Sequence, residues 1–433
     1  MVSKRKIVLS IAVLALLLSA VTGFSQAQTT AASGAPVTIK MMIWGAPADY
    51  DAINAGFLKT FPDMAKKVKF EVVVGGSGDA DVAQKLRLML AANGELPNII
   101  RLNYTQLAEF AEAGVLLDIS KYVNPYVDKI IPAALNVMKY NGKLYAFPQE
   151  VKTKIWWYRK DIFAECGIDP AKVKTVDDFI AAGKKIQQKY PNKYIENYLP
   201  PENAYDLTML LSGNGGRFCD ENGNYNIASD LKVKAAFETL KKLKDSGVTA
   251  PISEWSADWQ KSFGDGTIVS QLLASWMKMH LKTWTPALAG KWGAALWPEE
   301  IREGSESGGG IWVIPVKAEN KDLSAEILTK MYFEKEGAQS YYLATGRIPV
   351  LKDAASDPFY ALPDPYFGDK PNATQFKALE TLKIYPYTPA SSQELKIVVQ
   401  YLNEYMNGNL TVDQALSRAE KDLKNQIGNP YKR

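Results

Sequence analysis

The chain is poor in side chains that bind transition metals. Its 433 residues include one histidine, His280, and two cysteines, Cys166 and Cys219. Without a Cys-x-x-Cys pair, a zinc or copper site would have to rely on carboxylates. The sequence therefore predicts no metal site and no cofactor. Whether the two cysteines form a disulfide stays open, because sequence alone does not show that they approach each other.

Long apolar runs are also scarce. The longest covers residues 7–20, which is shorter than the roughly 20 residues that a helix needs to cross a bilayer. Three basic residues at 4–6 precede this run and a small-x-small sequence, SQA, follows it at 25–27. This order is typical of a secretory signal peptide. We therefore expect a cleavable signal peptide at 1–27, a linker at 28–36 and, since no cysteine near the cleavage site could carry a lipid, a protein that diffuses freely in the periplasm.

An excess of charge of one sign is missing as well. The formal charge of +4 falls to +1 when the leader with Lys4, Arg5 and Lys6 is removed. Such a balance gives no reason to expect nucleic acid as a partner. The mature chain of about 400 residues is too long for one hydrophobic core, since cores stop growing at about 250 to 300 residues. The sequence predicts two lobes with a cleft between them, and we expect a monomer.

The chain does contain an alternation of strand and helix patterns. This alternation indicates an α/β fold in which each lobe has a mainly parallel sheet flanked by helices. Further along, Thr175 and Thr411 each begin a capping box, which predicts that a helix starts there. The expected strands lie at 37–44, 70–74 and 97–102, and the expected helices at 50–61, 82–92 and 106–113.

Residues 220–224 have the sequence DENGN, which superficially resembles a calcium loop. The glycine stands one position too early for an EF-hand loop, whereas Asn222 and Gly223 form a common pair for a hairpin turn. We interpret the segment as a turn.

Several short segments occur in an order that one known family shares. They are AANGELPNII at 91–100, LAEFAEAGVLLDI at 107–119, NGKLYAFP at 141–148, WYRKDIF at 157–163, GGRF at 215–218, GGGIWVIP at 308–315 and GRIPV at 346–350. Each segment is a weak signal by itself, but the ordered set covers nearly the whole mature chain. In this set the chain resembles the extracellular solute-binding proteins of carbohydrate ABC transporters, the family that includes maltose-binding protein.

The resemblance implies a periplasmic-binding-protein fold. Two α/β lobes are then joined by hinge crossings, hold a carbohydrate between them, and dock on the membrane permease subunits of the transporter. The crossings are expected near 150–152, 311–313 and 355–361. The expected N-terminal lobe comprises 37–150 and 313–356, and the expected C-terminal lobe 151–312 and 357–433.

A sugar offers hydroxyl groups around its rim and apolar C–H faces, so its site needs flat aromatic rings beside short polar groups. The resemblance places Trp276 and Tyr205 where the family commonly stacks aromatic rings on sugars, although either ring could instead belong to a lobe core. The residues themselves suggest three more candidates, since ligands of open α/β sheets bind beyond the carboxyl ends of strands. Trp44 ends the first expected strand, and Asn103 and Tyr104 follow another.

Four further candidates lie at the crossings or in a loop of the first lobe. Glu150 and Lys152 occupy alternate positions of the first crossing, so both side chains should lie on one face. They could contact the ligand, or form an ion pair with each other or with the opposite lobe. Arg347 follows a glycine in a loop and is open to the same two interpretations, and Trp312 lies at a crossing. If Lys152 and Arg347 both face the cleft, an acidic sugar would fit.

The function expected from these features is the capture of a sugar or oligosaccharide by closure of the lobes. One alternative keeps the fold but binds an acidic or phosphorylated sugar, a polyol or a peptide. Another is a secreted glycosidase or lyase, which would need two carboxylates about 5 to 9.5 Å apart across the cleft. No such pair can be identified in the sequence, and a Gly-x-Ser-x-Gly nucleophile motif is absent from it. We expect that the protein is not an enzyme.

Overall fold

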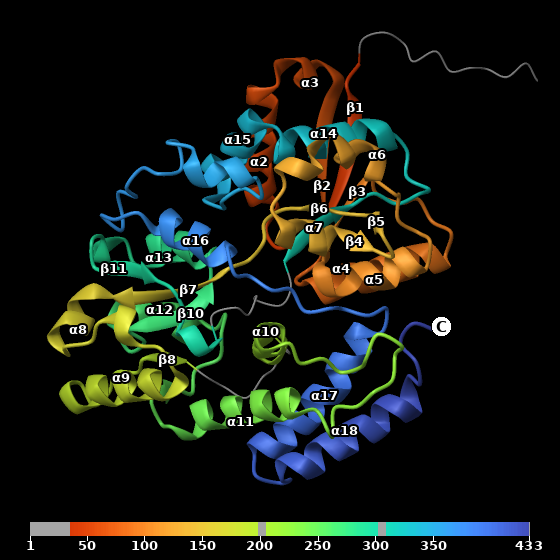
Figure 1. Ribbon diagram of the computed structural model, residues 1–433. Coiled ribbons are helices and arrows are strands. Elements are labelled where there is room, and N and C mark those ends of the chain that lie inside the picture. The colour runs from red at the N-terminus through yellow and green to blue at the C-terminus, as the bar shows by residue number, and fades with distance from the viewer. Residues whose placement is uncertain (1–34, 198–204, 302–308, 433) are drawn as a thin grey trace, which may run out of the picture.

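The computed structural model describes residues 35–197, 205–301 and 309–432. These residues form two α/β lobes, one above the other in Figure 1, as the sequence predicts. The expected signal peptide and its cleavage site lie outside the described residues.

The first lobe is built on a five-stranded sheet. Its strands, in their order across the sheet, are β2 (Val68–Gly76), β1 (Val37–Trp44), β3 (Ile99–Asn103), β12 (Gly310–Val313) and β6 (Phe147–Pro148). β1 pairs in parallel with β2 and β3, as the alternation of strands and helices predicts. β12 comes from much later in the chain and is antiparallel to both β3 and β6.

The helices that follow β1, β2 and β3 start two or three residues earlier than predicted. Pro47 stands in the first turn of α2, where its missing N–H costs nothing, and Asn103 caps α5. Gly114, with φ of +68°, follows the end of α5. The helices of this lobe are α2 (Pro47–Thr60), α3 (Pro62–Lys67), α4 (Asp79–Ala91), α5 (Tyr104–Glu112), α6 (Ser120–Val123), α7 (Pro132–Met138), α14 (Lys321–Phe333) and α15 (Lys335–Thr345), beside a hairpin of β4 (Lys139–Tyr140) and β5 (Lys143–Leu144).

The second lobe is built on a three-stranded sheet in the order β10 (Ser270–Ala274), β7 (Lys154–Arg159) and β11 (Trp292–Ala295). β7 is antiparallel to both neighbours, so the prediction of a mainly parallel sheet is wrong for this lobe. The reason is that β7 leads the chain away from the first lobe, while β10 and β11 lead it back. A separate parallel pair consists of β8 (Glu196–Asn197) and β9 (Thr249–Ala250).

Helices surround this second sheet, and α10 lies toward the first lobe in Figure 1. They are α8 (Lys160–Glu165), α9 (Val176–Lys189), α10 (Tyr205–Asn214), α11 (Leu231–Asp245), α12 (Ala257–Asp265), α13 (Met277–Trp284), α16 (Pro371–Leu379), α17 (Ser391–Met406) and α18 (Val412–Gln426). Short 3-10 turns are η1 (Asn124–Lys129), η2 (Pro170–Lys172), η3 (Pro286–Leu288), η4 (Glu299–Ile301) and η5 (Lys352–Ser356).

Alternate side chains of β7 enter two different hydrophobic clusters. Trp156 belongs to one cluster, and Ile155 and Trp157 belong to the other. Both Trp side chains are fully buried, which confirms the prediction that at least one of these neighbouring aromatics is a core residue. The first lobe has a cluster of its own, drawn from residues 39–151 and 311–360.

Both predicted capping boxes are present. Thr175 Oγ1 accepts a hydrogen bond from Asp178 N at 3.0 Å, and Thr411 Oγ1 accepts one from Gln414 N at 3.2 Å. The α9 and α18 helices therefore begin where the sequence predicts.

The segment with a likeness to a calcium loop is a turn, as predicted. Gly223 has φ of +81°, and Asp220 Oδ1 accepts hydrogen bonds from within the segment, among them the one from Asn224 N at 2.9 Å. Cys166 and Cys219 are both free thiols, which answers the open question about a disulfide.

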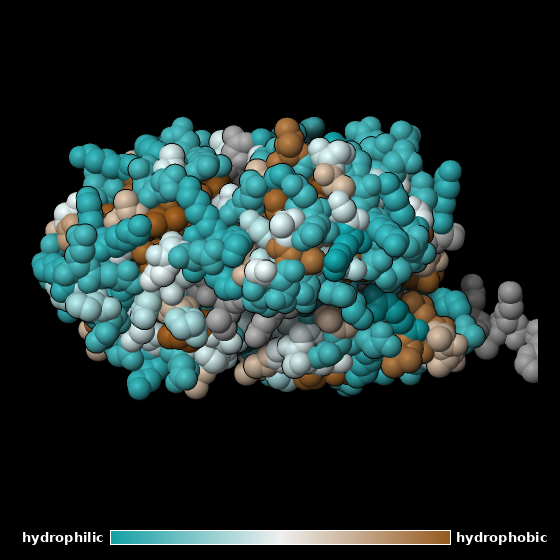
Figure 2. All heavy atoms as spheres, turned by 90° about the horizontal axis from the view of Figure 1, so that it is seen from below, coloured by the Kyte–Doolittle hydropathy of each residue, from teal (hydrophilic) through white to brown (hydrophobic). Residues whose placement is uncertain are grey.

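The surface that the structure describes is mainly polar where it can be viewed. Figure 2 shows the molecule from below the view of Figure 1, with hydrophobic side chains only in small separate groups. Isolated apolar side chains such as Leu231, 78% exposed, are normal on a protein surface. None of the helices in the described ranges combines the length and the apolar character that a membrane crossing requires.

Lys278 on α13 ties the second lobe to the first. Its side chain is 1% exposed, and Nζ donates a hydrogen bond to Asn372 Oδ1 at 2.8 Å. Nζ also lies 5.1 Å from the ring centroid of Tyr342 on α15, and Asn372 Nδ2 donates to Tyr342 Oη at 2.7 Å. Burial and then the charge of Lys282 lower the pKa of Lys278 to about 8, although Asp364 opposes them.

Replacing Leu416 by Ala should destabilise the second lobe strongly. Leu416 is buried on the inner face of α18, and truncation of a buried Leu typically costs about 2 to 5 kcal/mol. Leu231→Ala, at an exposed position, is the matched control and should leave the thermal midpoint nearly unchanged. Equal melting of the two variants would show that Leu416 is not a core residue.

The stability contributed at Lys278 should depend on pH. An ordinary lysine has a pKa of 10.5, and here it is lowered to about 8, so the folded state disfavours the charged form. Below pH 8 the lysine is charged in both states, and burying that charge costs on the order of 3 kcal/mol. This cost disappears as the pH rises from about 8 to 10.5. The stability of the wild-type protein relative to Lys278→Met should therefore rise over that window, as thermal midpoints at pH 7 and pH 10 would show. An equal difference at both pH values would contradict the assignment.

Candidate ligand-binding site

The first lobe contributes Trp44, at the carboxyl end of β1, to the boundary between the lobes. The guanidinium carbon of Arg101 lies 3.6 Å from the Trp44 ring centroid. Arg101 Nε donates to Gln149 Oε1 at 3.0 Å, and Nη1 donates to the hydroxyl of Tyr50. Burial lowers the pKa of Arg101 from its usual value. Arg101 therefore turns inward, where it supports the half-buried Trp44 ring from the protein side.

Asn103 and Tyr104 are used by the protein itself. Asn103 Oδ1 accepts a hydrogen bond from Thr105 N at 3.2 Å and so caps α5. Tyr104 is buried, and its hydroxyl donates to the carbonyl oxygen of Glu150. A side chain at Gly309 would collide with the Tyr104 ring, since its Cβ would lie 2.2 Å from ring atoms. These contacts place Asn103 and Tyr104 in the framework beneath the predicted site and not on its surface.

Glu150 and Arg347 form a buried ion pair. Glu150 is 2% exposed, and its Oε1 lies 3.1 Å from Arg347 Nε. Arg347 Nη1 also donates to Tyr341 Oη at 3.1 Å, and Ser275 Oγ lies 3.5 Å from Glu150 Oε2. Burial opposes the charge of Arg347, but Tyr341 and Glu150 raise its pKa above the ordinary value. Of the two interpretations of Glu150, the structure favours the ion pair, and its partner is Arg347.

The second lobe contributes a group of aromatic side chains, here called the aromatic wall, which consists of Trp255, Trp276, His280 and Trp284. Trp276 directly follows β10 and is half-buried. Its ring stacks on Trp255, with centroids 5.1 Å apart and an interplanar angle of 27°. Lys152, from the first crossing, places its Nζ 6.0 Å from the Trp276 ring centroid.

His280 belongs to the aromatic wall and is uncharged at neutral pH. Its ring meets Trp276 edge-on at 5.3 Å and stacks on Trp284 at 4.5 Å. Burial lowers the pKa of His280 to about 4, the charge of Arg347 lowers it further, and Asp49 opposes them. Because Arg347 and Asp49 both belong to the first lobe, the aromatic wall lies close to that lobe.

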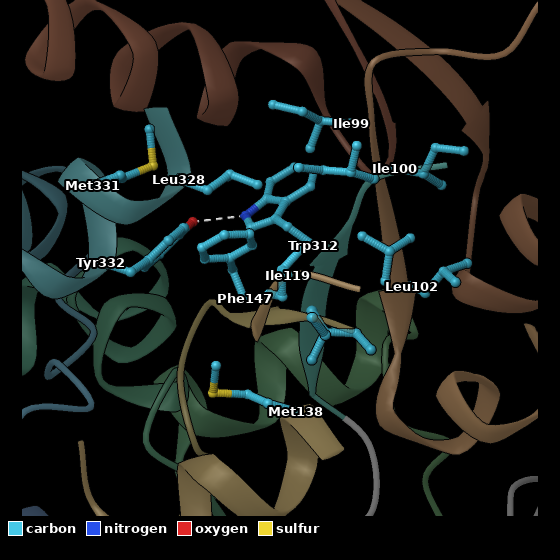
Figure 3. Close-up of a cluster of buried hydrophobic side chains, with 14 of the residues drawn as sticks. Ile99, Ile100, Leu102, Ile119, Met138, Phe147, Trp312, Leu328, Met331 and Tyr332 are labelled. Atoms are coloured by element: carbon cyan, nitrogen blue, oxygen red, sulfur yellow. Dashed lines mark hydrogen bonds between the residues drawn. The ribbon is translucent and has the colours of Figure 1, made fainter. Parts of the chain in front are cut away.

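Trp312 lies in the core of the first lobe, so the prediction that it contacts ligand is wrong. Its side chain is 1% exposed, and Nε1 donates to Tyr332 Oη at 2.7 Å. Figure 3 shows the indole enclosed by Ile99, Phe147, Leu328 and other apolar side chains. The physical reason is that β12 is an interior strand of the first sheet, which directs the indole onto the packed side chains of the lobe.

The structure thus brings some of the predicted residues together and separates others. Lys152 and Trp276 approach each other, and Arg347 acts on the neighbouring His280. Trp44 lies on the first-lobe side of the boundary. Tyr205 begins α10, but its side chain lies outside the part of the chain that the structure describes.

Sequence reasoning missed two residues of this region. Asp79 begins α4 after the glycine-rich end of β2, and the strand-end rule that selected Trp44 could have found it. Burial raises the pKa of Asp79, while Lys152 and Arg101 oppose this shift, and Gln106 Nε2 donates to its Oδ2 at 3.2 Å. Trp255 stands in a loop without periodic pattern, and nothing in the sequence distinguishes it from the other tryptophans.

The chemistry available at this boundary is that of binding. Flat aromatic faces lie beside charged and amide groups, an arrangement suited to a ligand with apolar faces and hydroxyl groups. The ring neighbours of His280 are tryptophans. Within the described ranges, no cluster of three or more His, Cys, Asp or Glu side chains is placed to hold a metal ion.

Two relatives are similar to most of the chain. The arabinooligosaccharide-binding protein of Bacillus subtilis (strain 168) is 27% identical over 309 residues, which cover 69% of each protein. The lactose-binding protein of Rhizobium radiobacter is 26% identical over 306 residues, which cover 67% of this chain and 70% of the relative. Both relatives are named as binding proteins.

Two solved structures share the fold. The ABC transporter associated binding protein from B. animalis subsp. lactis Bl-04, in complex with β-1,6-galactobiose, superposes with a TM-score of 0.76 at 23% identity, over 92% of this chain and all of that one. Maltose-bound MalE3 of T. maritima gives a TM-score of 0.73 at 19% identity, over 90% of this chain and all of that one. These likenesses confirm the predicted two-lobed fold.

A family model extends the likeness to a named family. The model described as bacterial extracellular solute-binding protein matches residues 58–371, well over half of the chain. The resemblance seen in the sequence is thereby confirmed, and the chain belongs to the bacterial extracellular solute-binding protein family.

Proposed function

We propose that this protein is the periplasmic substrate-binding component of an ABC transporter and that it captures a sugar or oligosaccharide between its lobes. The observation that carries the proposal is the half-buried aromatic wall around Trp276, which lies close to the polar edge of the first lobe. The sugars named for the two relatives and found with the two similar structures support this ligand class. The apolar run at 7–20 and the SQA sequence support export through a cleavable signal peptide.

In this proposal the ligand acts by differential affinity. A sugar that contacts both lobes binds the closed arrangement better than the open one and shifts the equilibrium by that difference. The closed monomer then delivers the sugar to the membrane permease subunits. The proposed lobes are 37–150 with 313–356 and 151–312 with 357–433, and the pairing of β12 with β3 favours moving the later boundary to residue 310.

The proposed ligand contacts are a subset of those expected from the sequence. Trp276, Tyr205, Lys152 and Trp44 are retained, and Asp79 is added because it lies near Lys152 at the end of β2. Glu150 and Arg347 are assigned to each other, which disfavours an acidic sugar, since Arg347 already has a carboxylate partner. A non-enzymatic role is proposed because the relatives are named as binding proteins and because His280 is uncharged and packed among tryptophans.

The mature protein should bind at least one sugar from a small panel without hydrolysing it. The panel consists of arabino-oligosaccharides, lactose, β-1,6-galactobiose and maltose, with galacturonic acid as the acidic arm. Binding only to the folded form should stabilise by about 2.7 kcal/mol at a hundredfold excess over the dissociation constant. Calorimetric titration, thermal midpoints and product analysis test this. Turnover of a bound sugar at enzymatic rates, or binding of galacturonic acid alone, would overturn the proposal.

Trp276→Ala should weaken binding far more than folding. Loss of an aromatic stacking partner costs on the order of 1 to 3 kcal/mol, by analogy with bases stacked on aromatic side chains, which is about a five- to hundredfold loss of affinity. The thermal midpoint without ligand should change little, because a half-buried ring leaves no sealed cavity when it is removed. Leu416→Ala is the opposite control, with a lowered midpoint and normal affinity. A Trp276→Ala protein that melts early and binds normally would make this ring a core residue.

A further inference from the structure

Trp255 is a large apolar side chain held at the surface in an unusual backbone conformation. It is 54% exposed, and its φ of +64° lies in the left-handed region, which bulky side chains rarely adopt. Such a conformation persists only where the surroundings hold it, and conformations of this kind cluster at ligand-binding positions.

The turn around Trp255 is held from both sides. Ser256 Oγ donates to the carbonyl oxygen of Ser253 at 2.8 Å, which closes the turn. The same hydroxyl oxygen accepts from Trp259 N at 3.1 Å and so caps α12. The backbone of α12 thereby fixes the position of the preceding Trp255, which would otherwise relax to an unstrained conformation.

The indole of Trp255 forms the outer layer of the aromatic wall. One face stacks on Trp276, with centroids 5.1 Å apart. The ring of His280 meets Trp255 edge-on at 5.5 Å, and Trp259 lies behind it, also at 5.5 Å. Since one face is covered in this way, more than half of the residue remains exposed on its other side.

The position of this exposed face relates it to the proposed site. Trp276, on which Trp255 stacks, lies within 6.0 Å of Lys152 from the first crossing. His280, which Trp255 also touches, is close enough to the first lobe for Arg347 and Asp49 to act on its pKa. An exposed aromatic face beside polar groups, near the opposite lobe, is the kind of surface on which the C–H face of a sugar ring packs.

We propose that Trp255 is a ligand-stacking residue, whose outer face receives a sugar ring of the ligand while Trp276 supports it from behind. The inference rests on the proposed function and assigns the direct aromatic contact to Trp255. In this arrangement the strained turn serves binding, because it holds the ring parallel to Trp276 before the ligand arrives and spares the ligand the cost of ordering it.

The test compares Trp255→Ala and Trp255→Gly with the wild-type protein in titrations with arabino-oligosaccharides, lactose, β-1,6-galactobiose and maltose. Both variants should lose about five- to hundredfold in affinity for the sugar that the wild-type protein binds, at least as much as Trp276→Ala loses. Glycine adopts positive φ without strain, so Trp255→Gly should melt no earlier than the wild-type protein. A loss of affinity in that variant is then not a loss of folding. Leu231→Ala removes an equally exposed apolar side chain and should keep full affinity.

Two outcomes separate this inference from the proposed function. If the wild-type protein binds none of these sugars, the proposed function falls and the inference with it. If the wild-type protein binds and Trp255→Gly binds equally well, or more tightly because the indole had been blocking Trp276, the inference alone falls.

Discussion

A buried ion pair between Glu150 and Arg347 fixes the point at which the chain passes from the first lobe to the second. Glu150 stands between the last strand segment of the first sheet and β7 of the second. Its carboxylate meets Arg347, its carbonyl oxygen accepts the Tyr104 hydroxyl, and Ser275 at the end of β10 lies beside it. Removing one member of a buried pair costs about 3 to 5 kcal/mol, because the other charge stays buried without a partner. The pair therefore defines geometry more than it adds stability.

This constraint also decides which side chains are left for a ligand. The donors of Arg101 are directed to Tyr50, Gln149 and the Trp44 carbonyl, and Arg347 is directed to Glu150 and Tyr341. Cations committed in this way are poor partners for an acidic sugar. What remains on the second lobe is the aromatic wall, which can pack against the apolar face of a neutral sugar while nearby polar groups meet its hydroxyls. The proposed ligand class follows from this division of roles.

The sequence predicts local structure well where the signals are local. The strand at 37–44 matches β1, and the Thr175 and Thr411 capping boxes mark helix starts correctly, because each depends on neighbouring residues. Strand direction is not contained in a pattern of period two, so the antiparallel sheet around β7 could not be predicted from it. The family resemblance identified the fold but placed Trp312 at a crossing, whereas its pairing with β3 buries it.

The candidate site was predictable only in part, for the same physical reason. The resemblance indicated Trp276 and Lys152, which the structure brings close to each other. The pairing of Glu150 with Arg347 joins residues far apart in the chain, and no sequence pattern specifies it. Trp255 depends on one backbone torsion angle and on a ring that stacks from another segment. Such features exist only once the lobes are folded.

The central claim is that a carbohydrate is held between the two lobes, and small-angle X-ray scattering tests it most directly. The radius of gyration of the mature protein is measured without sugar and with a saturating amount of the panel sugar that calorimetry shows to bind. Capture by closure predicts a smaller radius in the saturated protein, because the lobes approach each other around the ligand. An unchanged radius at full saturation would contradict the account, since the sugar would then occupy a site that does not bring the lobes together.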